Sequence, residues 1–448
     1  MTEQGERNSR HRIRSWHVAV FVLGALVIAF AVFRIVVRTK VNRRLDAVRA
    51  AGYPATCEEL DASYTIPAFA ENAADYITTA LSHLISPSTE DANGVPLFSN
   101  APLPRRRQAL DNPTKHVTAS MLAGNQKTLE LLRQGLAIPD CRYPVDFTQG
   151  NDAELIDLAA IRRTTRLLVM GAVLHAEQDD PNTATRMLLS SYGLARTLVK
   201  LPTIISQVVA QADLELTAEG LEQVVNRTTL TDAHLVQIDA ALYEGDDPDS
   251  MVRALAAERC FGLHMADEPS NYGPGNLSVA VAGILRELGV VDLSLIRHLD
   301  RMAEAIEIAQ MEPWKRKQAI ETAEARYNTS GISSILDWLT PPCARLIGVN
   351  VQGMARMQVA RTAVAVERYR LATAQLPQDT TDLVPGYLET TPIDPFDGRP
   401  LRYKKRDGGY VVYSIGPDGT DDGGTERQPK RQGGKEDLPY DITFIVER

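Results

Sequence analysis

The sequence predicts a mainly α-helical protein that consists of an N-terminal transmembrane helix, a helical body and a small C-terminal α+β domain. Three observations lead to this prediction. Residues 18–37 form an apolar run that only Arg34 interrupts, residues 151–345 repeat helix-length apolar patterns between turns rich in Asp and Pro, and residues 351–448 pass from one long helical pattern into short aromatic strands. A chain of 448 residues is long enough for two or three units with separate cores.

The composition narrows the class of protein. The formal net charge is −9 at pH 7, and such an acidic balance argues against nucleic acid as the main partner. Hydrophobic residues make up 44% and charged residues 23% of the chain, which is ordinary for a globular protein. Aromatic residues are sparse at 6%, and the abundant Ala and Leu favour helical packing over a β-rich body.

The N-terminal apolar run has the length of a membrane span. Twenty residues that each rise 1.5 Å cover about 30 Å, the thickness of the hydrocarbon layer. Trp16 lies where an interfacial aromatic anchor belongs, and Arg34 lies near the far end, where its stem can reach the interface. A cleaved signal peptide is the alternative, but its apolar region would be shorter and would end at small residues. We therefore expect an uncleaved single-span anchor at 18–37, preceded by a cytoplasmic tail at 1–17.

The orientation of this span is not decided by charge. Basic residues lie on both sides of it: Arg7, Arg10, Arg12 and Arg14 before it, and Arg38, Lys40, Arg43 and Arg44 after it. The positive-inside rule is therefore nearly balanced. A short tail followed by a large body is compatible with a single-pass protein of the cell membrane whose bulk is extracytoplasmic, in the periplasm.

Residues 45–150 read as an irregular, partly helical segment. Residues 69–84 carry apolar positions at helical spacing, whereas residues 86–107 hold four prolines and little periodicity, which predicts a surface loop. The triplet Arg105–Arg107 in this loop is either an anion-binding site or a solvated run of charge, and the second interpretation is favoured.

The body at 151–345 is predicted as helical hairpins. Asp152 is placed to cap a first helix, residues 179–182 break it, Pro202 opens a third helix and Asp232 caps a fourth. Helices of this length with short turns form antiparallel pairs, stacked as a superhelix or folded as a bundle. The outline is similar to tetratricopeptide repeats without their full 34-residue pattern. Such a scaffold usually presents a surface to a protein partner.

The sequence contains candidate catalytic residues but no recognisable catalytic motif. Glu258, Arg259 and His264 share one apolar helical segment, and His175 and Glu177 precede a turn. No HExxH, GxSxG, Walker A or dinucleotide-binding pattern occurs. We therefore expect a non-enzymatic protein, and the alternative is an extracytoplasmic, hydrolase-like enzyme with its site in the helical body.

The four cysteines give no sign of a metal or redox motif. They are far apart and lack a CxxC pair, which disfavours zinc and thioredoxin-type chemistry. Their even number allows disulfides, and buried free thiols are equally compatible with the sequence. The residues are Cys57, Cys141, Cys260 and Cys343.

The C-terminal block combines motifs that suggest a family. A long helical pattern from Val351 ends at Leu376-Pro377 and is followed by TTDLVPGYL, DPFDGRPLRY and GGYVVYSIGPDG. This order resembles the C-terminal domain of the major pseudopilin of type II secretion systems, over about a fifth of the chain. The resemblance implies an α+β fold with a small antiparallel sheet and a calcium-binding loop. It also implies a role near type II secretion or envelope assembly.

A candidate metal site lies in the loop Gly416–Gly424. Carboxylates and turn glycines gather there, and hard divalent cations such as Ca²⁺ prefer oxygen ligands on a chain that turns sharply. The resemblance implies Asp418 as the loop ligand, Asp441 as the closing ligand and the Ile415 carbonyl as a further one. Asp421 and Asp422 are additional candidates. A solvated acidic turn is the open alternative, and the insertion 425–438 is longer than the resemblance leads us to expect.

The chain departs from pseudopilins at its start. A pseudopilin has a short basic leader, a Gly-Phe processing site and a Glu five residues into the mature apolar helix. Here the apolar run follows Ser15-Trp16-His17 and contains no Glu. We therefore expect no processing by a prepilin peptidase and no stacking into a pilus.

Overall fold

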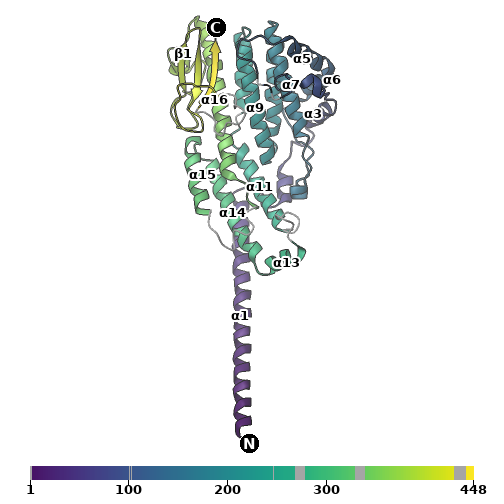
Figure 1. The fold of residues 1–448 in the computed structure, drawn as a ribbon, viewed down its shortest axis with the longest axis vertical. Coiled ribbons are helices and arrows are strands. Elements are labelled where there is room, and N and C mark those ends of the chain that lie inside the picture. The colour runs from purple at the N-terminus through teal and green to yellow at the C-terminus, as the bar shows by residue number, and fades with distance from the viewer. Residues whose placement is uncertain are drawn as a thin grey trace.

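The computed structural model describes residues 3–99, 101, 103–245, 247–267, 278–327, 339–427 and 440–447. It confirms the predicted class, because the chain is mainly helical with one long apolar N-terminal helix and a small antiparallel sheet near the C-terminus. The long helix α1 projects from the body, and the sheet lies at the end of the body farthest from the N-terminus (Figure 1).

Helix α1 (Glu3–Ala50) has two halves with different surroundings. Its large apolar residues from Trp16 to Val36 are exposed, whereas Val37, Val41 and Val48 are buried against the body. It is the one helix among the described residues that is long and apolar enough to cross a membrane. The predicted apolar span therefore continues without a break into a helix that belongs to the packed body.

The segment after α1 contributes short helices around the first part of the body. Residues 86–107, predicted as a loop, hold only the four-residue helix α4 within their described part. The interpretation of Arg106 as a solvated charge is wrong: its side chain is 10% exposed and pairs with Glu222, Glu426 and Glu447. The bounds are α2 (Cys57–Ser63), α3 (Ala73–Ser82), α4 (Thr89–Ala92), α5 (Asn112–Gly124) and α6 (Gln126–Gly135).

Four consecutive helices form the centre of the body: α7 (Leu158–Glu177), α8 (Pro181–Val199), α9 (Ile204–Val225) and α10 (Asp232–Gly245). The predicted break between the first two is present, where the Asp180 carboxylate accepts a hydrogen bond from the Thr183 N–H. The first cap differs from the prediction. Asp157, not Asp152, caps α7, because residues 147–152 form the 3₁₀ helix η1 (Phe147–Asp152) instead.

A second layer lies between this centre and α1. It consists of α11 (Ser250–Asp267), α13 (Val279–Glu287), α14 (Val290–Ala309) and α15 (Pro313–Tyr327), and α14 packs directly against α1 (Figure 1). Ion pairs add to this contact, since Arg34 and Arg44 of α1 meet Asp292 and Asp300 of α14. A second hydrophobic core joins this layer to residues 343–347 and includes Leu255, Met302 and Ile320.

Helix α16 (Cys343–Thr373) connects this layer with the sheet. It starts earlier than the predicted Val351, directly after Pro341 and Pro342, and packs against α9, α10 and α15. Met357 and Val364 of α16 belong to the same hydrophobic core as Leu214 and Leu221 of α9. The predicted C-terminal region at 351–448 therefore shares its core with the helical body.

The sheet contains β1 (Arg402–Arg406), β2 (Gly409–Ser414) and β3 (Ile442–Glu447), in the order β1-β2-β3 with antiparallel neighbours. The short 3₁₀ helix η4 (Thr380–Leu383) precedes it. Arg402 pairs with Tyr413, and Gly409 pairs with Glu447. All residues of β2 are buried, and the Tyr410 hydroxyl donates a hydrogen bond to the Ala363 carbonyl of α16. This hydrogen bond ties the start of β2 to α16 and so joins the sheet to the body.

Candidate functional site

The Asp- and Gly-rich loop follows β2 and turns through four glycines of positive φ. Gly416, Gly419, Gly423 and Gly424 have φ between 71° and 83°, a backbone conformation that other residues adopt only with strain. A Cβ on Gly416 would also lie 3.2 Å from the Tyr440 carbonyl oxygen. The glycines therefore allow the loop to fold back on the start of β3.

Asp441 is the residue around which this loop closes. Its side chain is buried, and its carboxylate accepts hydrogen bonds from the N–H groups of Gly424 at 2.7 Å, Thr425 at 3.3 Å and Asp422 at 3.4 Å. Burial raises the pKa of Asp441, and the three backbone donors oppose that shift. The predicted closing ligand is thus a buried carboxylate that holds the loop backbone.

The neighbouring carboxylates, Asp421 and Asp422, differ in how many hydrogen bonds they accept from the protein. Asp421 accepts hydrogen bonds from the Tyr413 hydroxyl at 3.1 Å and the Gly423 N–H at 3.0 Å. Asp422 has a buried Oδ2 without a hydrogen-bond partner. A buried carboxylate oxygen without a partner costs free energy. Asp422 is therefore the member of the loop that most needs a ligand or solvent.

The other two predicted ligands, Asp418 and Ile415, form hydrogen bonds with residues outside this cluster. Asp418 is exposed, and its carboxylate accepts a hydrogen bond from the Thr420 N–H at 3.0 Å. The Ile415 side chain is buried, and its N–H donates to Asp394 at 3.0 Å. The structure joins Asp441 to the backbone of Asp422 and shows no such contact between Asp418 and either residue within the described part of the chain.

Asp394 supports the loop from behind, a role that the sequence did not suggest. It is fully buried, forms an ion pair with Arg402 at 2.7 Å, and accepts hydrogen bonds from the Ser414 hydroxyl and the Ile415 N–H. The signal was present in DPFDG, where an Asp precedes a glycine turn. Gly398 in that turn has a φ of 71°.

The carboxylate and carbonyl oxygens of this loop are ligands of the kind that calcium prefers. Among the described residues, no group of three His, Cys, Asp or Glu side chains is arranged as metal ligands. Calcium sites also use backbone carbonyls and water, so two carboxylates with main-chain oxygens could serve. Residues 428–438 of the predicted insertion lie outside the described residues.

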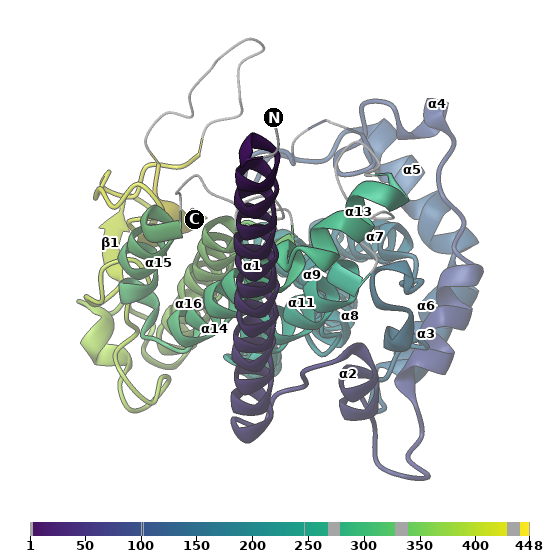
Figure 2. The ribbon, with the colours of Figure 1, turned by 90° about the horizontal axis from the view of Figure 1, so that it is seen from below.

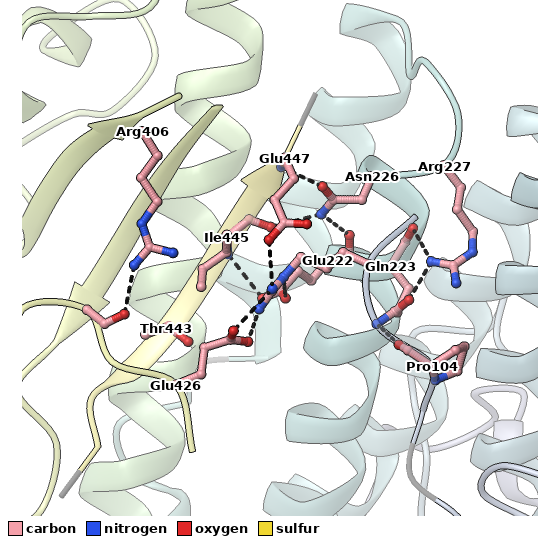
Figure 3. Close-up of polar contacts among 12 residues, drawn as sticks. Pro104, Glu222, Gln223, Asn226, Arg227, Arg406, Glu426, Thr443, Ile445 and Glu447 are labelled. Atoms are coloured by element: carbon pink, nitrogen blue, oxygen red, sulfur yellow. Dashed lines mark hydrogen bonds and ion pairs between the residues drawn. The ribbon is translucent and has the colours of Figure 1, made fainter. Parts of the chain in front are cut away.

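A polar seam joins the sheet to the helical body beside this loop. Glu222 of α9 and Asn226, directly after this helix, face the outer edge of β3 (Figure 3). The Glu222 carboxylate accepts from the Ile445 N–H at 3.2 Å, the Asn226 amide donates to the Ile445 carbonyl at 2.8 Å, and the Asn226 side-chain oxygen accepts from the Glu447 N–H at 2.7 Å. Side chains thus satisfy the backbone groups that an edge strand leaves open.

Charge is concentrated at the same seam. Arg106 binds Glu222 at 2.5 Å and also contacts Glu426 and Glu447. Burial raises the pKa of Glu222, and Arg106 counteracts the shift. The Arg106 guanidinium therefore connects the loop before α5 with α9 through Glu222, with the chain after the acidic loop through Glu426, and with β3 through Glu447.

The candidate catalytic residues of the body take separate structural positions. Arg259 donates to the Pro54 carbonyl at 3.1 Å and stacks over Tyr53. Burial raises the pKa of Glu258 to about 7, and a backbone hydrogen bond from Ile204 opposes the shift. His264 packs against Gly150, where an added Cβ would lie 2.1 Å from its ring.

His175 and Glu177 contribute to the end of α7. His175 lies 3.5 Å from Asp180, and Glu177 pairs with Lys115 and accepts from the Leu110 N–H. These contacts tie the turn after α7 to α5 and to the loop before α5.

The cysteines are free and buried. Burial raises the pKa of Cys57 and Cys260 to about 12, so both thiols are protonated and unreactive near neutral pH. The sequence allows either disulfides or buried free thiols, and the structure contains buried free thiols.

A cavity of about 370 Å³ opens where α1 meets the body. Its lining includes Arg34 and Arg38 of α1, Cys57 of α2, His264 of α11 and Asp292 of α14. Both signs of charge are present, and the cavity lies at the end of the body that faces the apolar half of α1.

Comparison of this chain with models of protein families, with curated proteins and with solved structures found no match.

Proposed function

We propose that this chain is a single-pass envelope protein anchored in the cell membrane by α1. The observation that carries the proposal is the continuity of α1, whose exposed apolar half passes directly into a half that is buried in the body. Cleavage within α1, as for a signal peptide, would remove contacts of the folded body. Arg34 pairs with Asp292, and Val37 and Val41 are buried. These contacts favour an uncleaved anchor.

The body is proposed to lie outside the cytoplasm, as in the resembling family. The test is a reporter enzyme that is active only outside the cytoplasm, fused after the last residue and compared with a reporter active only inside. We expect activity of the first alone, on a product of full-length mass. Activity of the cytoplasmic reporter alone contradicts the orientation, and loss of the first residues from the mature protein contradicts the anchor.

The helical body is proposed to bind a protein partner of the secretion or envelope-assembly machinery. Support comes from the packed antiparallel helices α7 to α10, an architecture that typically offers side-chain surface to other proteins. Photo-crosslinkers at exposed Val208 and Val236, compared with one at exposed Ile85, test this in intact cells. We expect a discrete protein adduct from α9 or α10. Identical adduct patterns at all three sites contradict a specific surface.

The C-terminal region is proposed to be pseudopilin-like and to bind calcium at Asp422 and Asp441, with Asp421, Asp418 and the Ile415 carbonyl as further ligands. The partnerless Oδ2 of Asp422 supports this, because a cation would satisfy it. The order of helix α16, hairpin, acidic loop and final strand also agrees with the resemblance.

Calcium binding is tested on the full chain, because residues 351–448 share their core with the body. A ligand at 100 times its dissociation constant stabilises the folded state by about 2.7 kcal/mol. We therefore expect the melting temperature in millimolar calcium to exceed that in chelator. Asp422→Asn should remove the difference without lowering the melting temperature in chelator.

The matched control is Asp407→Asn, at an exposed Asp in the turn between β1 and β2. It should keep the full calcium response. Asp441→Asn is less suitable, because this carboxylate also holds three backbone N–H groups. A wild-type chain whose melting temperature is the same in calcium and chelator excludes the metal site and leaves the anchor untouched.

A further inference from the structure

Helix α13 exposes apolar side chains that no described part of the chain covers. Val279 is 79% exposed, Ile284 57% and Leu288 51%, and Val281 is exposed as well. Within the helix only Ala282 is buried. Val281, Ile284 and Leu288 follow spacings of three and four residues, so they share one face of the helix. A contiguous exposed apolar face on a folded protein marks a binding surface.

The position of α13 along α1 is fixed by direct contacts. The Arg34 guanidinium donates to the Arg286 carbonyl at 2.6 Å and pairs with Asp292 at 3.2 Å. A Cβ on Gly289, directly after the helix, would lie 3.2 Å from the Phe33 ring. The C-terminal end of α13 therefore lies beside residues 33 and 34 of α1, on the side of the body that faces the N-terminus (Figures 1 and 2).

This position coincides with the boundary of the proposed membrane. From Val18 to Phe33 α1 rises only about 22 Å, less than the hydrocarbon thickness of about 30 Å that a span has to cover. The bilayer therefore has to reach at least to the level of Arg34, and α13 is at that level. Interfacial helices bury their apolar face about 5–10 Å into the boundary between headgroups and acyl chains.

Charge at this level agrees with a lipid surface. Arg38, Lys40 and Arg43 of α1 are exposed at the level where headgroup phosphates would lie, and Arg38 also lines the cavity between α1 and the body. Basic residues beside an apolar helix face are typical of segments that lie in the plane of a membrane surface.

From these contacts we propose that α13 is an interfacial membrane helix that seats the body on the bilayer next to α1. The proposal rests on membrane anchoring by α1. The occupant of the apolar face is the outer part of the lipid leaflet, and a protein partner or a second copy of the chain would be a different outcome.

The test places nitroxide spin labels on the full chain in nanodiscs of phosphatidylcholine and phosphatidylglycerol. One label is attached at Ile284→Cys, one at Ile28→Cys in the span, and one at Val236→Cys, an exposed position of α10 in the body. The four native thiols are buried, and the labelled wild-type chain gives the background. The ratio of accessibility to oxygen, which enters lipid, and to a water-soluble nickel chelate is then measured.

We expect the ratio at 284 to exceed that at 236 at least threefold and to approach that at 28. A ratio at 284 equal to that at 236 overturns the interfacial helix while a high ratio at 28 preserves the anchor. Low accessibility of position 284 to both reagents shows a protein cover and also overturns it. A low ratio at 28 removes the anchor and the interfacial helix together.

Discussion

At the end of the body that faces α1, the imidazole of His298 joins α14 to α11, whereas at the far end Glu222 and Asn226 join α9 to β3. His298 is buried and neutral: it contacts the Thr340 hydroxyl at 2.9 Å and the Arg259 carbonyl at 3.2 Å. The far seam instead holds ionised groups around Arg106. The contact at His298, here called the first joint, therefore requires a neutral imidazole. The contact between α9 and β3, the far joint, requires the ion pairs of Arg106 and the hydrogen bonds to the edge of β3.

The largest expected effect is the pH dependence of the first joint. Burial lowers the pKa of His298 from 6.5 to about 4; the hydrogen bond to the Arg259 carbonyl opposes this shift, and the positive charges of Arg259 and Arg301 contribute to it. Because the folded pKa is the lower one, the stabilising contribution is complete above pH 6.5 and is lost as pH falls towards 4. The loss amounts to about 3 kcal/mol of unfolding free energy.

The measurement is chemical denaturation of the full chain in detergent at several pH values between 4 and 7. His298→Gln, which cannot take up a proton, should flatten the curve over this window. His83→Gln, at an exposed histidine, is the control and should keep the slope of the wild type. An unchanged slope in His298→Gln contradicts the buried neutral imidazole.

The same joint should be sensitive to a single methyl group. An added Cβ on Gly262 of α11 would lie 2.3 Å from the His298 ring and 2.9 Å from the Leu339 carbonyl oxygen. Overpacking of this kind costs about 1–3 kcal/mol, and we expect about 2 kcal/mol for Gly262→Ala. Gly348→Ala in α16, where nothing lies within 4 Å, should be neutral or stabilising. Equal denaturation midpoints for the two variants would falsify the close contact.

The far joint should respond more weakly and locally. Asn226→Ala leaves the Ile445 carbonyl and the Glu447 N–H without their side-chain partner, which costs about 1 kcal/mol or more. Hydrogen exchange should show faster exchange of the Glu447 amide, with the amides of α14 unchanged. Asn112→Ala, at an exposed position of α5, is the control. Unaltered exchange at Glu447 would show that α9 does not hold the strand edge.

The sequence predicts correctly those features of the fold that depend on residues close together in the chain. The apolar run, the break at residues 179–182 and the aromatic hairpin follow from sequence periodicity and turn residues, and all three are present. Element starts were less accurate. The sequence predicts Asp152 as the cap of α7, whereas Asp157 caps it, because both Asp residues precede the same apolar pattern.

The joints could not be predicted, because their partners are far apart in the sequence. Arg106 and Glu222 are 116 residues apart, and Asn226 and Ile445 are 219 apart. No spacing within one helix or strand indicates such pairs. For the same reason the sequence predicts Arg106 as a solvated charge and a separate region from residue 351, whereas α16 packs against α9 and α10.

The unbroken course of α1 determines how the body can move above a bilayer. A helix of 48 residues is about 72 Å long, and no turn or glycine-rich linker separates its apolar half from Val37, Val41 and Val48 in the core. The body is therefore connected to the membrane span by a continuous helix and not by a flexible linker. Any tilt or rotation of the span is therefore transmitted to α14, against which the second half of α1 packs.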